Sequence, residues 1–181
     1  MVTLNKVRRS RICVAVFACV GIVALILDRV TKVWALQELS MGENISVIPG
    51  LLSLQLLHNP GASLGMGSST TWLISLLAIV MSICLLIAGC MSRSLVWSVC
   101  LGLALAGAFG NLIDRVIYAN GVLNGSVVDF LNYGWSVGNV ADIWLVIAGV
   151  GLVILIFASV PFRPQEQEGS PERSSAAMET R

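Results

Sequence analysis

The chain has 181 residues, of which 56% are hydrophobic and 12% are charged, and its net charge is +1. Soluble domains carry about 25% charged residues, so this chain has too little polar surface for a water-soluble fold, and the bilayer is its expected solvent. The small net charge, with no basic run or nucleic-acid motif in the sequence, excludes nucleic acid as an expected partner.

Four apolar segments are long enough to cross a bilayer as helices, which takes about 20 residues each. They cover residues 12–36, 72–91, 95–117 and 140–160. Basic residues before the first segment also fit a secretory signal, but no small-residue cleavage site leads into a soluble domain, so we expect a retained helix. The sequence therefore predicts one four-helix membrane domain over residues 12–160, between polar, disordered tails at 1–11 and 161–181.

The distribution of basic residues predicts the orientation of the helices. Four lie before the first apolar segment and one lies between the second and third: Lys6, Arg8, Arg9, Arg11 and Arg93. Basic residues that flank membrane helices stay on the cytoplasmic side, so both termini are expected there. Residues 37–71 and 118–139 are then expected on the outer side.

The longer outer segment contains a predicted β-hairpin. Apolar residues run over 45–48 and 51–57, and Pro49-Gly50 between them is a turn signal. We expect this hairpin to form a small cradle against the outer surface of the membrane. After it, residues 59–65, which contain a proline and two glycines, are expected to form either a plain turn or a shaped loop whose backbone can approach a ligand. In the shorter outer segment, residues 127–130 are expected to form a turn.

All four aspartates fall at the outer ends of predicted helices or in an outer segment: Asp28, Asp114, Asp129 and Asp142. A charged side chain at the centre of a membrane helix costs roughly 2.5–3.5 kcal/mol to insert. The directions of the predicted helices place Asp28, Asp114 and Asp142 at the same depth. They are therefore either interfacial helix-end residues or parts of one site.

Two asparagines favour the interpretation as a site. Asn111 and Asn139 each precede an aspartate by three residues, so they share a helix face with Asp114 and Asp142 respectively. Two carboxylates in one small space share a proton. The ionised one can accept a proton from an attacking water, and the protonated one can donate to a peptide carbonyl. The sequence therefore predicts aspartic protease chemistry.

Two basic residues lie beside these aspartates. Lys32 follows Asp28 by four residues, the spacing of an ion pair on one helix face, and that pair is either structural or part of the site. Arg115 directly follows Asp114, so it points away from it and is expected either to snorkel to the membrane surface or to anchor a neighbouring segment, rather than to pair with Asp114.

The cysteines and the single histidine do not predict a site. The five cysteines lie in apolar stretches without a Cys-x-x-Cys pair, and His58 has no cysteine neighbours. Free thiols are expected, with no metal centre and no cofactor.

Five motifs in chain order resemble those of the lipoprotein signal peptidases, also called signal peptidase II. They are Asp28-x-x-x-Lys32, Asn59-Pro60-Gly61-Ala62-Ser63, Gly107-Ala108-Phe109-Gly110-Asn111-Leu112-Ile113-Asp114-Arg115, Val128-Asp129-Phe130 and Asn139-Val140-Ala141-Asp142. The resemblance extends from Asp28 to about Ala148. Leu64 departs from the second motif, which usually ends in phenylalanine; this concerns the wall of the substrate site.

The resemblance implies an all-α integral membrane protease of the bacterial inner membrane, with its active site at the outer face. It would remove the signal peptide from diacylglyceryl-modified prolipoproteins, cutting just before the lipidated cysteine, and globomycin would inhibit it. Asp114 and Asp142 would be the catalytic pair. The residues expected to bind substrate or support the site are Asp28, Lys32, Asn59, Gly61, Asn111, Arg115, Asp129 and Asn139. We expect a monomer whose partners are prolipoproteins and membrane lipids.

Two other functions would also use such residues. A small transporter often has carboxylates within the membrane, but it needs polar residues along its whole path, and the inner halves of the last three segments have almost none. A scaffold that binds lipid without catalysis would not require both aspartates, and an activity assay separates it from an enzyme.

Overall fold

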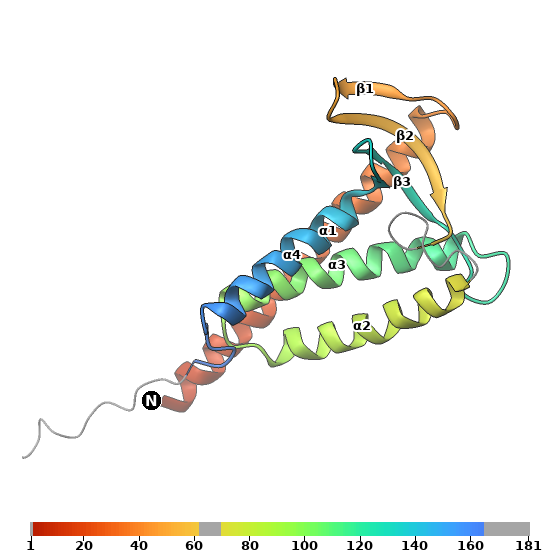
Figure 1. Ribbon diagram of the computed structural model, residues 1–181. Coiled ribbons are helices and arrows are strands. Elements are labelled where there is room, and N and C mark those ends of the chain that lie inside the picture. Colours follow the sequence, from red (N-terminus) through yellow and green to blue (C-terminus); the bar gives the residue numbers. More distant parts are fainter. Residues whose placement is uncertain (1, 62–69, 165–181) are drawn as a thin grey trace, which may run out of the picture.

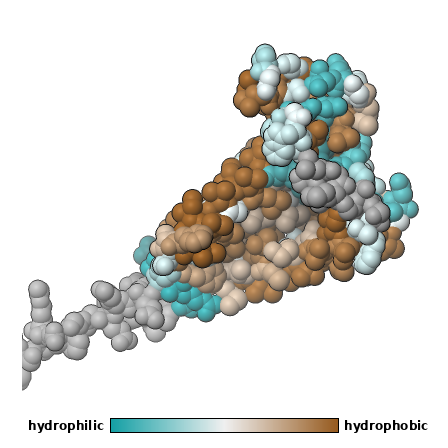
Figure 2. Space-filling view, in the orientation of Figure 1, coloured by the Kyte–Doolittle hydropathy of each residue, from teal (hydrophilic) through white to brown (hydrophobic). Residues whose placement is uncertain are grey.

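The computed structural model describes residues 2–61 and 70–164. Four helices, α1 (Val2–Glu38), α2 (Thr71–Met91), α3 (Leu95–Ile117) and α4 (Val140–Phe157), form an elongated bundle with a small sheet at one end (Figure 1). All four are long and apolar enough to cross a membrane, as the sequence predicts. Figure 2 shows that the surface along the bundle is mainly hydrophobic, whereas hydrophilic residues gather around the sheet and at the opposite tip.

The ends of two predicted segments differ from the structure. Helix α1 begins at Val2, so the polar N-terminal residues described here are helical, and the prediction of disorder over residues 1–11 was wrong for them. Lysine and arginine are good helix formers, which lets an apolar helix continue into a basic end. Helix α4 ends at Phe157, and most of the predicted C-terminal tail lies outside the described residues.

Helix α3 is the central helix, because α1, α2 and α4 all pack against it. Two glycines make the close contacts possible. A Cβ on Gly102 would lie 2.8 Å from the carbonyl oxygen of Phe17 in α1, and one on Gly107 would lie 2.6 Å from that of Ala141 in α4. Small residues at such contacts let membrane helices approach closely.

Four antiparallel strands form the sheet, in the order β1-β2-β3-β4. Strands β1 (Ile45–Ile48) and β2 (Leu52–Asn59) are the predicted hairpin, and β2 begins one residue later and ends two residues later than expected. Strands β3 (Val127–Asn132) and β4 (Val137–Gly138) come from the second outer segment. The prediction of a turn over residues 127–130 was therefore wrong: β2 supplies a hydrogen-bonding partner that local sequence cannot reveal.

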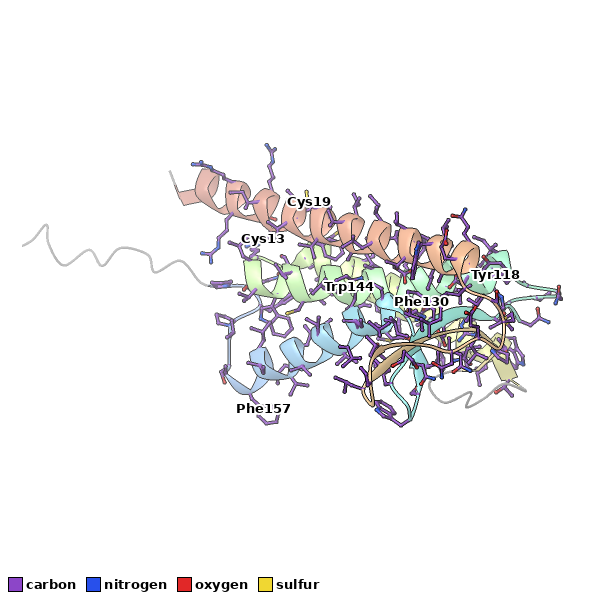
Figure 3. The ribbon with its side chains drawn as sticks, turned by 90° about the horizontal axis from the view of Figure 1, so that it is seen from above. Cys13, Cys19, Tyr118, Phe130, Trp144 and Phe157 are labelled. Carbon is purple, nitrogen blue, oxygen red and sulfur yellow. The ribbon has the colours of Figure 1, made fainter. Side chains whose placement is uncertain are left out.

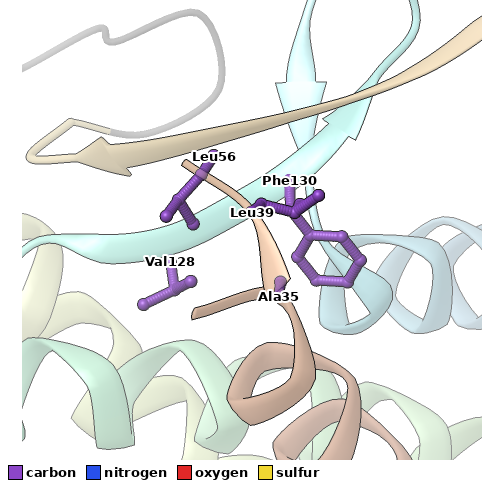
Figure 4. Packing of buried hydrophobic residues seen from close by; sticks show 5 residues of the cluster. All are labelled: Ala35, Leu39, Leu56, Val128 and Phe130. Atoms are coloured by element: carbon purple, nitrogen blue, oxygen red, sulfur yellow. The ribbon is translucent and has the colours of Figure 1, made fainter. Parts of the chain in front are cut away.

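An apolar cluster fixes the sheet to the end of α1. Its buried members, shown in Figure 4, come from α1, the residue after it, β2 and β3: Ala35, Leu39, Leu56, Val128 and Phe130. Because side chains alternate along a strand, β3 directs Val128 and Phe130 into this cluster and its intervening residues to the other face. That second face contributes to the site described below.

The cysteines lie away from the sheet. Figure 3 shows Cys13 and Cys19 on the half of α1 remote from it, and all five cysteines are free thiols, as predicted. In the same figure Trp144 lies between α4 and α1, where its indole nitrogen donates to the carbonyl of Ala24 at 3.1 Å. This bond helps to hold α1 against α4, the two helices that contribute Asp28 and Asp142.

Candidate active site

A buried ion network joins α1 to α3 below the sheet. The Lys32 ammonium lies 3.1 Å from Asp28 and 2.8 Å from Asp114. Arg29 Nη1 lies 2.7 Å from Asp114 Oδ1, and its Nη2 lies 3.0 Å from Asp28 Oδ2. The sequence prediction of an Asp28–Lys32 pair is confirmed. Arg29 was not predicted as a member, although its position next to Asp28 within an apolar helix was a signal.

The two aspartates of this network are also held by backbone. Asp28 accepts from the amide of Ala141 in the first turn of α4 at 3.0 Å, where a carboxylate is favoured by the helix dipole. A Cβ on Gly110 would lie 2.6 Å from Asp28 Oδ2, so only glycine allows this approach. Asp114 accepts from the amide of Val128 in β3 at 3.2 Å. Both carboxylates therefore fix helices and sheet relative to one another.

A second group of polar residues lies beside the ion network. Asn139 is the N-cap of α4, and its side-chain oxygen accepts from the amide of Asp142 while its own amide donates to Asp142 Oδ2 at 3.0 Å. This is a reciprocal capping arrangement. Asn111 donates to the other carboxylate oxygen of Asp142 at 2.9 Å and accepts from Lys32 at 2.9 Å. The predicted pairing of asparagines and aspartates is thus seen between helices as well as within α4.

Asp129 belongs to the same hydrogen-bonded group. Its Oδ1 accepts from Asn139 Nδ2 at 2.6 Å, and its Oδ2 accepts from Asn59 Nδ2 at 2.9 Å. Asn139 consequently contacts both Asp129, through its side chain, and Asp142, through its backbone. Burial raises the pKa of Asp129 from 3.8 to about 6, with a contribution from the charge of Asp142 and against the lowering effect of the Asn59 hydrogen bond.

A cavity of about 650 Å³ lies between α4, the end of α3 and the sheet. Asp129 and Asp142 both line it, together with apolar side chains such as Val127 and Val146. Asp28 and Asp114 do not line it. The structure therefore brings Asp142 into one cavity with Asp129, and it places Asp114 in the ion network. Strand alternation explains Asp129: it shares a face with Val127, opposite the buried core residues.

Arg115 anchors the loop after β2. Its guanidinium donates to the carbonyl of Gly61 at 2.6 Å and lies 3.4 Å from those of Pro60 and Gly125. No ion pair joins it to Asp114 among the described residues, which agrees with the predicted anchoring role. Arg115 and Gly61 both line the cavity.

The rest of the loop motif is only partly described. The amide of Gly61 donates to Asn59 Oδ1 at 3.0 Å, and both residues line the cavity. The sequence prediction that this motif forms a shaped loop at the site agrees with this geometry. Its remaining residues, including Leu64, lie outside the described residues. Within residues 2–61 and 70–164, no group of three His, Cys, Asp or Glu side chains is placed to hold a metal ion.

Comparison with known proteins gives consistent matches. A family model described as signal peptidase (SPase) II matches residues 20–158. A lipoprotein signal peptidase from Bifidobacterium longum subsp. infantis is 65% identical over 158 residues, which are 87% of each chain. One from Rhodococcus jostii is 41% identical over 140 residues, covering 77% of this chain and 70% of the relative. A solved structure described as a bacterial membrane enzyme at 2.3 Å resolution superimposes with a TM-score of 0.71 at 27% identity, covering 83% of this chain and 93% of that one.

Proposed function

The chain belongs to the signal peptidase II family, the lipoprotein signal peptidases, and we propose that Asp129 and Asp142 are its catalytic pair. It is a membrane aspartic endopeptidase that removes the signal peptide from diacylglyceryl-modified prolipoproteins, just before the lipidated cysteine. The observation that carries the proposal is the cavity of about 650 Å³ that both carboxylates line, and Asn139 links the two carboxylates by donating a hydrogen bond to each.

This pair differs from the one expected from the sequence, in which Asp114 was the partner of Asp142. Asp114 and Asp129 are equally buried, but the geometry favours Asp129 because Asp114 contacts two cations and does not line the cavity. A catalytic carboxyl must come within about 3 Å of the water or carbonyl that exchanges a proton with it. A carboxylate that lines the cavity can meet this requirement, whereas a carboxylate enclosed by Arg29 and Lys32 cannot.

The chemistry follows from two carboxyl groups that share one site. One stays ionised and accepts a proton from the attacking water, while the other is protonated and donates to the carbonyl oxygen of the scissile bond. A proton then reaches the leaving amine. The two groups titrate together, so the proton belongs to the pair. The pKa of Asp129, raised to about 6 by burial, suits this role near neutral pH.

The other polar residues position the pair. Asn111, Asn139 and Asn59 donate amide hydrogen bonds that fix the carboxylates in orientation. The ion network of Asp28, Arg29, Lys32 and Asp114 holds α1 against α3 and the start of α4. Arg115 holds Gly61, which lines the cavity with Asn59, by donating to its carbonyl. We assign these residues to positioning or substrate binding.

We further propose that both termini are cytoplasmic and that the site faces outward. The side chain of Arg9 donates to the carbonyl of Arg93, and the backbone amide of Arg93 donates to the carbonyl of Phe162. The start of α1, the α2–α3 loop and the segment after α4 therefore meet at one end, where Arg8 and Arg163 add further positive charge. The sheet, whose strands β3 and β4 contribute residues to the cavity, lies at the opposite end (Figure 1). The positive-inside rule supports the cytoplasmic assignment of the basic end.

Three further assignments complete the proposal. The chain acts as a monomer with a single membrane domain over residues 12–160, flanked by the short cytoplasmic segments. The apolar walls of the cavity accommodate the residues next to the scissile bond and the lipid-bearing cysteine, in contact with membrane lipids. A globomycin-type cyclic peptide would occupy the same cavity and compete with the prolipoprotein.

Cleavage of a purified diacylglyceryl preprotein tests the catalytic pair. Cleavage is followed as the shift of the preprotein to a smaller product on a gel. Asp129→Asn and Asp142→Asn should each abolish this shift, because asparagine can neither ionise nor supply an acidic proton. Circular dichroism and thermal unfolding in detergent establish that each variant is folded. Near-normal cleavage by either folded variant would remove that residue from the pair. A preprotein with an unmodified cysteine, cut as fast as the lipidated one, would contradict the substrate assignment.

A further inference from the structure

Strand β4 is an edge of the sheet that lies beside the proposed catalytic pair. The sheet ends at β1 on one side and at β4 on the other. Ser136, Val137 and Gly138 all line the cavity together with Asp142. An edge strand presents unpaired N–H and C=O groups to any extended chain that lies alongside it. The position of β4 makes this edge available to a peptide inside the cavity.

The register identifies which backbone groups face the cavity side. β3 and β4 pair Leu131 with Gly138 and Asn132 with Val137. The amide of Tyr133 donates to the carbonyl of Ser136 at 2.9 Å. Because hydrogen-bonded and non-hydrogen-bonded pairs alternate in an antiparallel ladder, Asn132 and Val137 form a non-hydrogen-bonded pair. The N–H and C=O of Val137 therefore point away from β3, and no described residue pairs with them.

Gly138 brings the same strand close to a catalytic carboxylate. A Cβ at this position would lie 2.8 Å from Asp142 Oδ2, so any other residue would displace that carboxylate or the strand. Adjacent strands lie about 4.8 Å apart. A peptide paired with Val137 would thus lie one inter-strand spacing from β4 and would pass close to Asp142.

The substrate needs such a partner. A peptide bond inside a helix has its carbonyl enclosed by the helical hydrogen bonds, so a signal-peptide helix must unwind around the cut. The unwound N–H and C=O groups then enter a cavity with largely apolar walls, where unpaired polar backbone is costly. The outward N–H and C=O of Val137 can pair with one substrate residue. This is the β-strand addition by which many proteins bind extended peptides.

We propose that the segment of the prolipoprotein at the cut site binds as a fifth strand on β4, through the backbone of Val137. This assignment rests on the proposed function, since it places the scissile bond by Asp142. The side chain of Val137 is not required; its N–H and C=O are the positioning groups. The reaction would therefore depend on the backbone of the substrate in a position-specific manner.

An ester scan of the substrate tests the proposal on the unaltered enzyme. Synthetic diacylglyceryl peptides are prepared in which one backbone amide at a time, other than the scissile one, is replaced by an ester, which removes the N–H donor. One position should lose about tenfold in kcat/KM, and the positions on either side of it should change less than about threefold. Equal losses at all positions, or none at any, would refute the strand.

A pair of variants links this effect to β4. Val137→Pro removes the N–H without removing a bond to β3, and Val137→Ala keeps the backbone groups as the matched control. The Val137→Pro enzyme should lose about tenfold in kcat/KM with the all-amide peptide, because the substrate carbonyl loses its donor. The sensitive ester removes the other hydrogen bond of the same residue pair, the one that the Val137 carbonyl accepts. Once proline has weakened the pairing, this ester should cost the variant less than it costs the native enzyme, and fully multiplicative losses would mean that the two bonds do not belong to one pair. If the proline variant does not fold, the ester scan alone decides.

The two proposals fail separately. Asp129→Asn assayed with the all-amide peptide tests the catalytic pair, and activity there would remove the pair while leaving a position-specific ester scan intact. A flat ester scan with an active native enzyme would remove the fifth strand and leave the pair.

Discussion

Replacing Asp114 by asparagine should destabilise the chain far more than it impairs the chemistry. The carboxylate is 1% exposed and lies 2.7 Å from Arg29, 2.8 Å from Lys32 and 3.2 Å from the amide of Val128. Removal of one partner from a buried ion pair costs about 3–5 kcal/mol, because the remaining charges stay buried without full compensation. Asparagine retains the shape of the side chain, so the loss is mainly electrostatic.

Thermal unfolding in detergent measures this cost. For a chain of this length each kcal/mol lowers Tm by about 2–4 °C, so Asp114→Asn should unfold about 6–20 °C below the native chain. Assayed well below its own Tm, it should retain cleavage within about tenfold of the native rate. Asp129→Asn is the matched control: the same chemical change should reduce cleavage by about 10²–10⁴-fold, with a smaller change in Tm.

The opposite pattern would refute the assignment. If Asp114→Asn kept the native Tm and lost cleavage as completely as Asp142→Asn, Asp114 would be the second catalytic carboxyl, as the sequence motifs first suggested. If Asp129→Asn were also active, the cavity would not be the site of peptide hydrolysis.

Further predictions concern pH, packing and topology. The pKa of Asp129 is raised from its ordinary value of 3.8 to about 6 in the folded chain, so the folded chain binds this proton more tightly than the unfolded chain does. The resulting contribution to the free energy of unfolding is complete below pH 3.8 and is lost as the pH rises through about 6. Asp129→Asn should therefore reduce the fall in Tm over this pH range. Gly138→Ala should lower kcat without unfolding the chain, because the new methyl group meets Asp142 Oδ2 at 2.8 Å; an unchanged kcat would mean that the strand moves instead. Single cysteines at the exposed positions Asn124 and Ser159, with the native five replaced, should react with an impermeant reagent on protoplasts at 124 and not at 159, and the reverse would overturn the orientation.

Much of the site could be predicted from local spacing. The Asp28–Lys32 pair follows from a separation of four residues on one helix, and the structure has it at 3.1 Å. The Asn139–Asp142 contact follows from the preference for asparagine at an N-cap with an acid three residues on. These contacts lie within one helix or at its N-cap, where the helix geometry fixes which groups meet.

Local sequence spacing could not indicate that Asp129 lines the cavity beside Asp142. Residues 127–130 were expected to form a turn, but their strand conformation depends on pairing with β2, about 70 residues earlier in the chain. Once β3 is formed, alternation sends Asp129 to the cavity and Phe130 to the core. The signal was present as an acid between apolar residues, but its meaning required the partner strand.

By itself the sequence determined the four membrane helices and the relative depth of the polar residues, because insertion into a bilayer depends on the summed hydropathy of each segment. Depth places Asp28, Asp114 and Asp142 at one level but does not say which way each side chain points around the bundle. That choice was made by tertiary packing: Gly107 and Gly110 let α3 approach α4 and α1. The cations of α1 then enclose Asp114, and Asp142 is left to face the cavity with Asp129.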